Sequence, residues 1–311
     1  RNLTMNDLFY TETGERADLA ASIVPNPPHG YIGTKLMPIT PMGEKSGTLY
    51  YATLPVDQPA DTARTVGAAP ASTQLATSNT TFLCAELSRR ASIAPDEAKS
   101  YGGIDKADEV GAKSAVRSVM NAQEALIAAA TLGKPASATF DAAKFFEIAQ
   151  GALTTVRLYS GKTVLYGAAV TIKKAVQALL ADKTFGPVLS RTISGTTNAV
   201  AAAGLNEQAW YSALALLMGV DEVLPGDDTI WAAGALAGKI GLAKIDDGAN
   251  PLSHKWEPVL GKTFQFLPDG SSPFVIQAIA DRVNVNNHYD CYSWVDVKTL
   301  NTGANYTFEG I

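Results

Sequence analysis

The chain has 311 residues, with 25 Lys and Arg against 30 Asp and Glu, and so a formal net charge of −5 at pH 7. This acidic balance argues against binding nucleic acid through phosphate neutralisation, and no apolar run is long enough to span a membrane. A chain of this length buries enough surface to fold without disulfides, so the two cysteines, Cys84 and Cys291, are expected to be free, mostly buried thiols.

Charged residues make up 18% of the chain and hydrophobic residues 46%, a balance that suits a protein covering much of its surface with partners. Residues 1–45 are rich in proline, including the stretch PNPP at 25–28, and this composition favours an extended arm over a packed helix. The first residue is Arg1 and not an initiator Met, so we expect either a proteolytic cut before it or upstream residues missing from this sequence.

A long β-hairpin is predicted next. Residues 47–54 (GTLYYATL) are β-prone, and residues 79–92 are expected to form the returning strand. The tip between them, residues 56–78, contains few large apolar side chains and cannot bury a core of its own. We therefore expect the hairpin and the arm to become ordered by lying against another subunit.

The middle of the chain predicts helices. The strongest signal covers residues 106–132, with Asp105 as the N-cap and a buried face that includes Val116, Val119, Leu126 and Ala130. Further helices are expected from about residue 141, at 169–182 and at 207–218, with a strand at 162–166 and a loop at 183–206.

The remaining residues predict strands, at 219–224, 239–245, 255–267, 273–285 and 289–298. Helices gathered in the middle and strands gathered at the end indicate an α+β fold, because a parallel α/β sheet would alternate the two.

Four charged residues are candidates for contacts between subunits. Arg89 and Arg90, at the base of the hairpin, could pair with acidic groups of a neighbour or form a solvated surface pair. Asp227 and Asp228 lie in an acidic loop that could line a symmetry axis or hold a divalent cation, although the spacing does not match an EF-hand and a solvated turn is the simpler interpretation.

Catalytic and nucleotide-binding motifs are weak. On a strand, His288 and Asp290 would share one face while Cys291 points to the other, so Cys291 could not easily use that imidazole. The triplets Gly-Lys-Thr at 161–163 and 261–263 lack the leading glycine of a P-loop and predict turns that enter strands. We expect no cofactor and no enzymatic activity.

The predicted order is an extended arm, a long hairpin, a long helix, a mixed region and terminal strands. Two stretches add detail: GVDEVLPGDDTIWAAGALAGKIGLAKIDD at 219–247 and DCYSWVDVKTLNTGANYTFEGI at the C-terminus. In this arrangement and in these stretches the sequence resembles the Hong Kong 97-like major capsid proteins of tailed bacteriophages. The resemblance covers nearly the whole chain but rests on no invariant signature.

The resemblance implies a domain plan. Residues 1–45 would be the N-terminal arm, 46–93 the E-loop, 94–136 a peripheral domain with the spine helix, 137–253 the axial domain, and 254–311 the closing strands of the peripheral domain. Some relatives crosslink subunits through an E-loop lysine, but the hairpin here carries Arg64 and no lysine between Lys45 and Lys99, so crosslinking is not predicted. Arg64 joins Arg89, Arg90, Asp227 and Asp228 as an expected interface residue.

The function that the resemblance implies is structural. The chain would assemble as hexamers and pentamers into an icosahedral virion shell in the host cytoplasm, enclosing double-stranded DNA that it contacts weakly, with scaffold, portal and decoration proteins as partners. One alternative is an encapsulin-like nanocompartment shell with an enzyme cargo. A second, from another class, is a hydrolase that uses His288 and Asp290, which would need a nucleophile in reach and a conventional pocket.

Overall fold

The computed structural model describes residues 14–16, 30–53, 77–102, 104–135, 137–195, 207–246, 258–268, 272–281 and 286–311. Most of the predicted arm lies outside these residues, and so does the predicted tip of the hairpin except residues 77–78, which belong to a strand. Within the described part, the strands form a six-stranded sheet (β1-β11-β12-β10-β2, with β5 on the other side of β12), a five-stranded sheet (β6-β13-β9-β7-β8) and the two-stranded pair β3-β4.

The strands are β1 (Gly14–Glu15), β2 (Ile39–Met42), β3 (Ser46–Ala52), β4 (Thr77–Leu83), β5 (Ala85–Ile93), β6 (Ala138–Thr139), β7 (Lys162–Ala168), β8 (Glu222–Gly226), β9 (Ile240–Ile245), β10 (Gly261–Phe266), β11 (Val275–Asp281), β12 (Asn286–Thr299) and β13 (Asn305–Glu309). The helices are α2 (Gly33–Leu36), α3 (Pro95–Ser100), α4 (Ile104–Leu132), α5 (Phe145–Val156), α6 (Ala169–Ala181), α7 (Gly186–Ser194), α9 (Glu207–Met218) and α10 (Asp228–Trp231), with short 3-10 turns η2 (Gly234–Leu236) and η4 (Thr302–Ala304). Most strand pairs are antiparallel, which confirms the α+β class.

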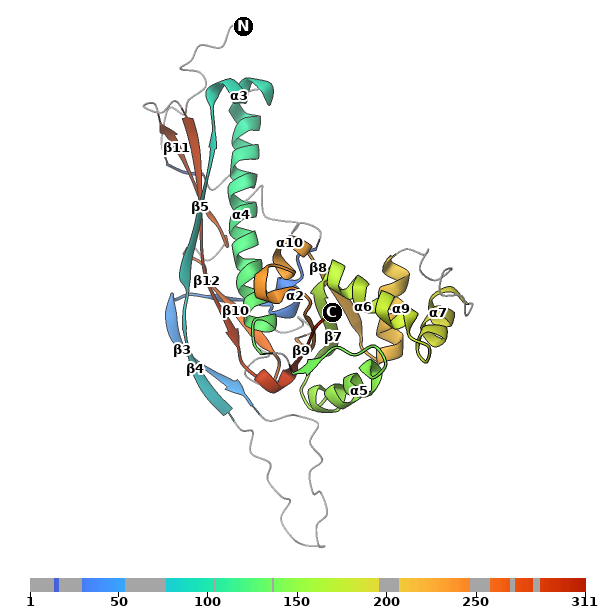
Figure 1. Cartoon of the computed structure of the whole chain (residues 1–311). Coiled ribbons are helices and arrows are strands. Elements are labelled where there is room, and N and C mark those ends of the chain that lie inside the picture. Colours follow the sequence, from blue (N-terminus) through green and yellow to red (C-terminus); the bar gives the residue numbers. More distant parts are fainter. Residues whose placement is uncertain are drawn as a thin grey trace, which may run out of the picture.

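Helix α4 lies along the six-stranded sheet and forms the long axis of the body (Figure 1). Its 29 residues span roughly 43 Å at 1.5 Å per residue. The half nearer its N-terminus packs on β5, β11 and β12 through small side chains such as Ala112 and Ala115, which contact Tyr289 and Ile276 in one cluster. Small residues on the helix let it approach the sheet closely enough to bury these larger partners.

The C-terminal end of α4 reaches the second sheet. Ile127 and Leu132 pack with Val164 and Tyr166 of β7 on one face of the five-stranded sheet. The other face, which includes Leu165 of β7, is covered by α5, α6 and α9. Strand β7 is therefore buried on both faces, and α4 joins the elongated body to the unit drawn beside it in Figure 1.

Several predicted elements are confirmed. The helix expected at 106–132 begins slightly earlier, at Ile104, and ends at Leu132; the helices expected at 169–182 and 207–218 are α6 and α9. Both Gly-Lys-Thr triplets enter strands, since β7 begins at Lys162 and β10 at Gly261. Both cysteines are free and buried, as expected.

Two predictions along the hairpin and the helices are wrong. The single returning strand at 79–92 is two strands, because the chain passes at Cys84 from the hairpin into the six-stranded sheet. The loop expected at 183–206 contains helix α7, which begins with Pro187 in its first turn and ends at Gly195 in a left-handed conformation. Few large apolar side chains mark α7, which hid its periodicity.

Two further expectations are corrected by packing. Leu126 does not lie on the buried face of α4 but is 43% exposed, whereas Gln123 and Glu124 are buried. Residues 305–309 do not close the six-stranded sheet as expected for 254–311. They form β13, which pairs with β9 and β6 in the five-stranded sheet and buries Phe308 beside Phe145.

A glycine of α4 tests the close approach of helix and sheet. A Cβ at Gly111 would lie 2.3 Å from the Tyr289 ring. Gly111→Ala should therefore lower the free energy of unfolding by about 1 to 3 kcal/mol, measured by urea denaturation. Gly151→Ala in α5 is the control, because no atom lies within 4 Å of a Cβ there and alanine should stabilise that helix by about 0.5 to 1 kcal/mol. Equal effects at the two positions would contradict the close packing.

Candidate functional site

The β3–β4 hairpin has a buried face and an outward face. On the buried face, Leu49 and Phe82 pack with Phe264 of the six-stranded sheet, and the two phenylalanine rings lie 5.5 Å apart. The base is also held by a hydrogen bond, in which Leu83 N–H donates to the Asp296 carboxylate of β12 at 2.8 Å. The start of the hairpin is thus fixed to the body.

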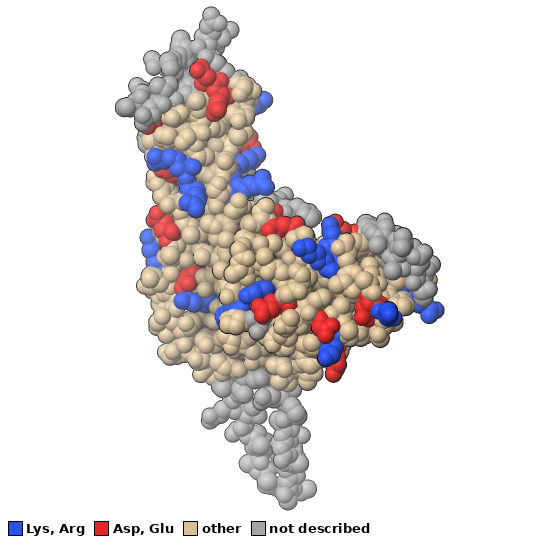
Figure 2. All heavy atoms as spheres, viewed as in Figure 1, with Lys and Arg blue, Asp and Glu red and all other residues tan. Residues whose placement is uncertain are grey.

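The outward face of the described strands β3 and β4 has no charged side chain. Its members alternate with the buried ones and pair across the two strands: Ser46, Thr48 and Tyr50 on β3 with Leu83, Thr81 and Asn79 on β4. We call these six residues the outer hairpin face. Tyr50 is 61% exposed and Leu83 67% exposed. Figure 2 shows the side of the body that carries the hairpin with few charged atoms near these strands.

A two-stranded ribbon with large exposed apolar side chains is marginally stable in water. Another surface that covers Tyr50 and Leu83 would remove apolar area from water and stabilise the ribbon. The arrangement therefore favours a contact with a further protein surface at this face.

Arg90 has its partner within the same chain. Its guanidinium donates two hydrogen bonds to Asp290, with Nε–Oδ1 and Nη2–Oδ2 distances of 2.6 Å. These bonds hold the pKa of the Asp290 carboxyl below its usual value, and Tyr292 donates a further bond to it. Asp290 is largely buried while the Arg90 side chain is 52% exposed.

Arg89 lies on the opposite face of β5 and is exposed. Both arginines border an open depression of about 440 Å³ together with Ser88 and Tyr292. Pairing of Arg89 with a neighbouring subunit stays a prediction, and Arg64 lies outside the described residues.

Asp227 and Asp228 act as helix caps. The Asp227 carboxylate accepts a hydrogen bond from Thr229 N–H at 2.8 Å and caps α10. The Asp228 carboxylate accepts one from Val170 N–H at 2.7 Å, at the start of α6. The Asp227 carboxylate thus caps α10 itself and the Asp228 carboxylate ties α10 to α6, while their role at a symmetry axis stays a prediction. Within the described residues, no three His, Cys, Asp or Glu side chains gather closely enough to hold a metal ion.

A buried carboxylate that the sequence pattern did not reveal lies on α4. Glu124 is 2% exposed and accepts hydrogen bonds from the backbone N–H groups of Ile32 and Gly33 and from the Trp231 indole N–H, at 2.8 to 3.0 Å. Burial raises the pKa of Glu124, and the three donors act against that rise. The only signal for this site in the sequence is a glutamate beside the buried stripe of the long helix.

The geometry around His288 differs from the predicted pair. His288 Nδ1 lies 2.7 Å from Ser92 Oγ, and His288 Nε2 lies 3.4 Å from Asp281 Oδ2. Asp290 pairs with Arg90 instead. Cys291 is buried on the opposite face, as predicted, and burial raises its pKa to about 12, which disfavours a thiolate.

Ser92, His288 and Asp281 resemble a Ser-His-Asp arrangement in composition only. All three lie in regular antiparallel strands, and β12 is paired on both sides, with β5 and β11. Its backbone N–H groups are used by these ladders and not for an oxyanion. The set fits a cross-strand polar contact better than a hydrolytic centre.

Comparison with known proteins gives structural matches. No protein-family model and no curated sequence matches the chain. A phage-related protein from Bordetella bronchiseptica RB50 matches with a TM-score of 0.68 at 14% identity, over 96% of this chain and 98% of its own. The capsid of a native GTA particle matches with a TM-score of 0.51 at 11% identity, over 92% and 91% of the two chains.

The chain has the Hong Kong 97-like capsid fold. A third match, the SrpI encapsulin from Synechococcus elongatus PCC 7942, has a TM-score of 0.50 at 13% identity, over 92% and 90% of the two chains. The Hong Kong 97-like fold expected from the sequence is therefore confirmed. Among the described residues, no helix is both long and apolar enough to cross a bilayer.

Glu124→Ala should be strongly destabilising. The substitution leaves three donors without an acceptor, two of them backbone N–H groups, so we expect the free energy of unfolding to fall by about 3 kcal/mol or more in a denaturant titration. Leu126→Ala is the control, because Leu126 lies two residues further along the same helix and is exposed. It should change the free energy of unfolding by less than about 1 kcal/mol. If Glu124→Ala lowers the free energy of unfolding no more than Leu126→Ala does, the hydrogen bonds to Glu124 do not stabilise the fold.

Glu124→Gln tests the pH dependence. Because the folded-state pKa of Glu124 is raised, the native state binds more protons than the unfolded state above the ordinary value of 4.5. Stability that Glu124 supplies at low pH should therefore be lost as pH rises through its folded pKa. We therefore expect the wild type to be more stable than Glu124→Gln at low pH and this difference in unfolding free energy, measured by urea titration, to shrink as pH rises. A difference that grows with pH would contradict the raised pKa.

Arg90→Met and Arg89→Met separate the two arginines. Arg90→Met should raise the pKa of Asp290 and cost about 1 kcal/mol of unfolding free energy near neutral pH, because a largely buried carboxylate loses its partner. This cost should fade as pH drops and Asp290 becomes protonated. Arg89→Met should leave the stability of the isolated chain nearly unchanged, and equal losses at both positions would refute the assignment.

Proposed function

We propose that the chain is the major capsid subunit of a tailed bacteriophage, which assembles as hexamers and pentamers into an icosahedral shell around double-stranded DNA. The observation that carries this proposal is the match over 96% of the chain to a phage-related protein with the same fold. Fold alone permits many functions, so the chain's own surfaces must supply the physical reason for assembly.

The outer hairpin face supports self-assembly. Tyr50 and Leu83 expose large apolar surfaces on the outward face of β3 and β4, and a neighbouring copy would bury them. A subunit that makes several modest contacts at once is held by effective concentration, so a shell can be stable without one strong interface. The low charged fraction of 18% favours such extensive contact.

The other expected partners follow from this role. The net charge of −5 fits weak contact with packaged DNA, because close phosphate binding needs clustered Lys and Arg. We propose a virion location, assembly in the host cytoplasm, and scaffold, portal and decoration proteins as further partners. The role is structural and needs no cofactor or catalytic residue; hydrolysis lost on His288→Ala would overturn this part.

An encapsulin-like compartment is the alternative within the same fold. Its specific support is the match to the SrpI encapsulin, which is no better than the phage-related match. The contents of native particles separate the two: packaged double-stranded DNA supports the capsid, and an enzyme cargo supports the compartment.

Assembly and the outer hairpin face can be tested together. The full chain, expressed with any scaffold it requires, should give closed particles by electron microscopy and light scattering. Tyr50→Asp and Leu83→Asp should each reduce the particle yield about tenfold or more, because a charge would be buried at the contact. Only small species from the wild-type chain would overturn the proposed function.

Tyr50→Phe is the matched control, since it keeps the apolar ring at the same position. This variant should assemble like the wild type, and all three variants should show the wild-type circular dichroism spectrum before assembly. Full assembly of both aspartate variants would remove the outer hairpin face from the proposal while leaving the shell itself in place.

A further inference from the structure

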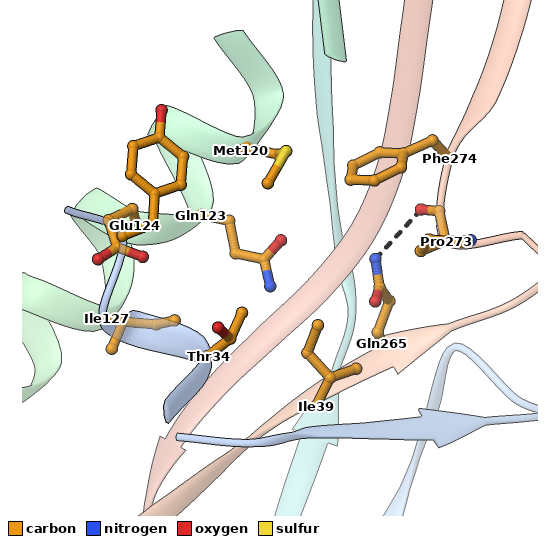
Figure 3. Close-up of a pocket in the computed structure, with 10 residues that line it drawn as sticks. Thr34, Ile39, Met120, Gln123, Glu124, Ile127, Gln265, Pro273 and Phe274 are labelled. Atoms are coloured by element: carbon orange, nitrogen blue, oxygen red, sulfur yellow. Dashed lines mark hydrogen bonds between the residues drawn. The ribbon is translucent and has the colours of Figure 1, made fainter. Parts of the chain in front are cut away.

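A cavity lies between helix α4, strand β2 and residues 273–274, which lead into β11 (Figure 3). Its volume is about 200 Å³ and its wall is mainly apolar, with Ile39, Met120, Ile127 and Phe274 among the lining residues. For comparison, an engineered apolar cavity of about 150 Å³ holds a benzene molecule. The space is therefore large enough for one small ring with a substituent.

One polar group in the wall lacks a partner. Gln123 is 6% exposed, and its side-chain Nε2 has no hydrogen-bond acceptor among the described residues. Figure 3 shows this amide nitrogen directed into the cavity. Leaving such a buried donor unsatisfied costs about 1 to 3 kcal/mol, so a bound acceptor would be stabilised there.

Two other polar side chains of the wall, Gln265 and Glu124, are already engaged. Gln265 Nε2 donates to the Pro273 carbonyl at 3.1 Å and to Ser293 Oγ at 2.9 Å. Glu124 accepts from three N–H groups, as described above. The Glu124 carboxylate would also repel a second anion at this low-dielectric wall. With these two side chains engaged, the Gln123 amide offers a free donor to an incoming molecule, and the Glu124 carboxylate disfavours a negatively charged one.

We infer that this cavity is a binding site for a small neutral molecule that carries one aromatic or alicyclic ring and one hydrogen-bond acceptor, such as an aryl ketone. The ring occupies the apolar space beside Met120 and Phe274, and the acceptor receives the Gln123 amide N–H. Thioether sulfur and an aromatic ring both make favourable contacts with an aromatic ligand. The inference does not depend on the proposed capsid function.

The position of the cavity gives ligand binding a structural consequence. Ile39 belongs to β2, Met120 and Gln123 to α4, and Phe274 to the residues that lead into β11. A ligand bound to the folded state would hold these three elements together and raise the stability of the body by mass action.

Binding can be tested with a matched pair of probes on the full-length chain. The probes are para-fluoroacetophenone, which has a carbonyl acceptor, and para-fluoroethylbenzene, which has nearly the same shape without it. In fluorine NMR titrations the ketone should bind about three- to tenfold more tightly than the hydrocarbon. Absence of saturable binding by the ketone would overturn the inference.

Two variants locate the probe. Gln123→Leu removes the donor at similar volume, so a buried carbonyl would have no partner and the preference for the ketone should be lost or reversed. Ile39→Trp, at a position 38% exposed, should block the cavity and abolish binding of both probes with little risk to folding, which circular dichroism checks. Unchanged ketone binding in Ile39→Trp would place the probe elsewhere, and an unchanged ketone preference in Gln123→Leu would overturn the role of Gln123.

Discussion

The buried carboxylate of Glu124 is the contact on which the architecture depends. It accepts hydrogen bonds from the backbone N–H groups of Ile32 and Gly33 and from the indole N–H of Trp231, so one side chain of α4 holds both the start of helix α2 and helix α10. A buried carboxylate is unfavourable unless its oxygens accept hydrogen bonds, and here three donors meet it. Gly33 is required for this approach, because a Cβ there would lie 2.5 Å from Glu124 Oε2.

Around this contact, the long helix α4 packs on both sheets. The first part of α4 packs on the six-stranded sheet through alanines and Gly111, and its last turns pack on the five-stranded sheet beside Tyr166. A buried ion pair between Lys262 of β10 and Asp246, just after β9, adds a second link between the sheets. Removing one partner would leave a buried charge unpaired, which is strongly destabilising. The body and the second unit are therefore held as one piece.

Hydrophobic periodicity predicted the elements that the local sequence determines. The long helix, α6 and α9 were predictable because their apolar residues recur at helical spacing, and the fold family followed from the order of elements. The buried role of Glu124 was not predictable, because a glutamate among Ala and Gln on a long helix resembles a solvated residue. Its partner Trp231 lies 107 positions along the chain and is brought beside it only by the fold. The same limit applies to β13, whose sheet is decided by pairing with β9, and to Arg90, whose partner Asp290 lies 200 positions along the chain.

The described part of the hairpin shows which surface of the chain would gain most from being covered. Its buried face is held by Phe82 against Phe264, while its outward face exposes Tyr50 and Leu83 without a charge to keep them in water. An isolated ribbon of two strands gains little from its own ladder, so most of its stabilisation must come from what covers it. Charges are instead satisfied inside the chain, as with Arg90 and Asp290. Apolar area is thus left exposed on β3 and β4, and this is the area that the proposed shell would cover.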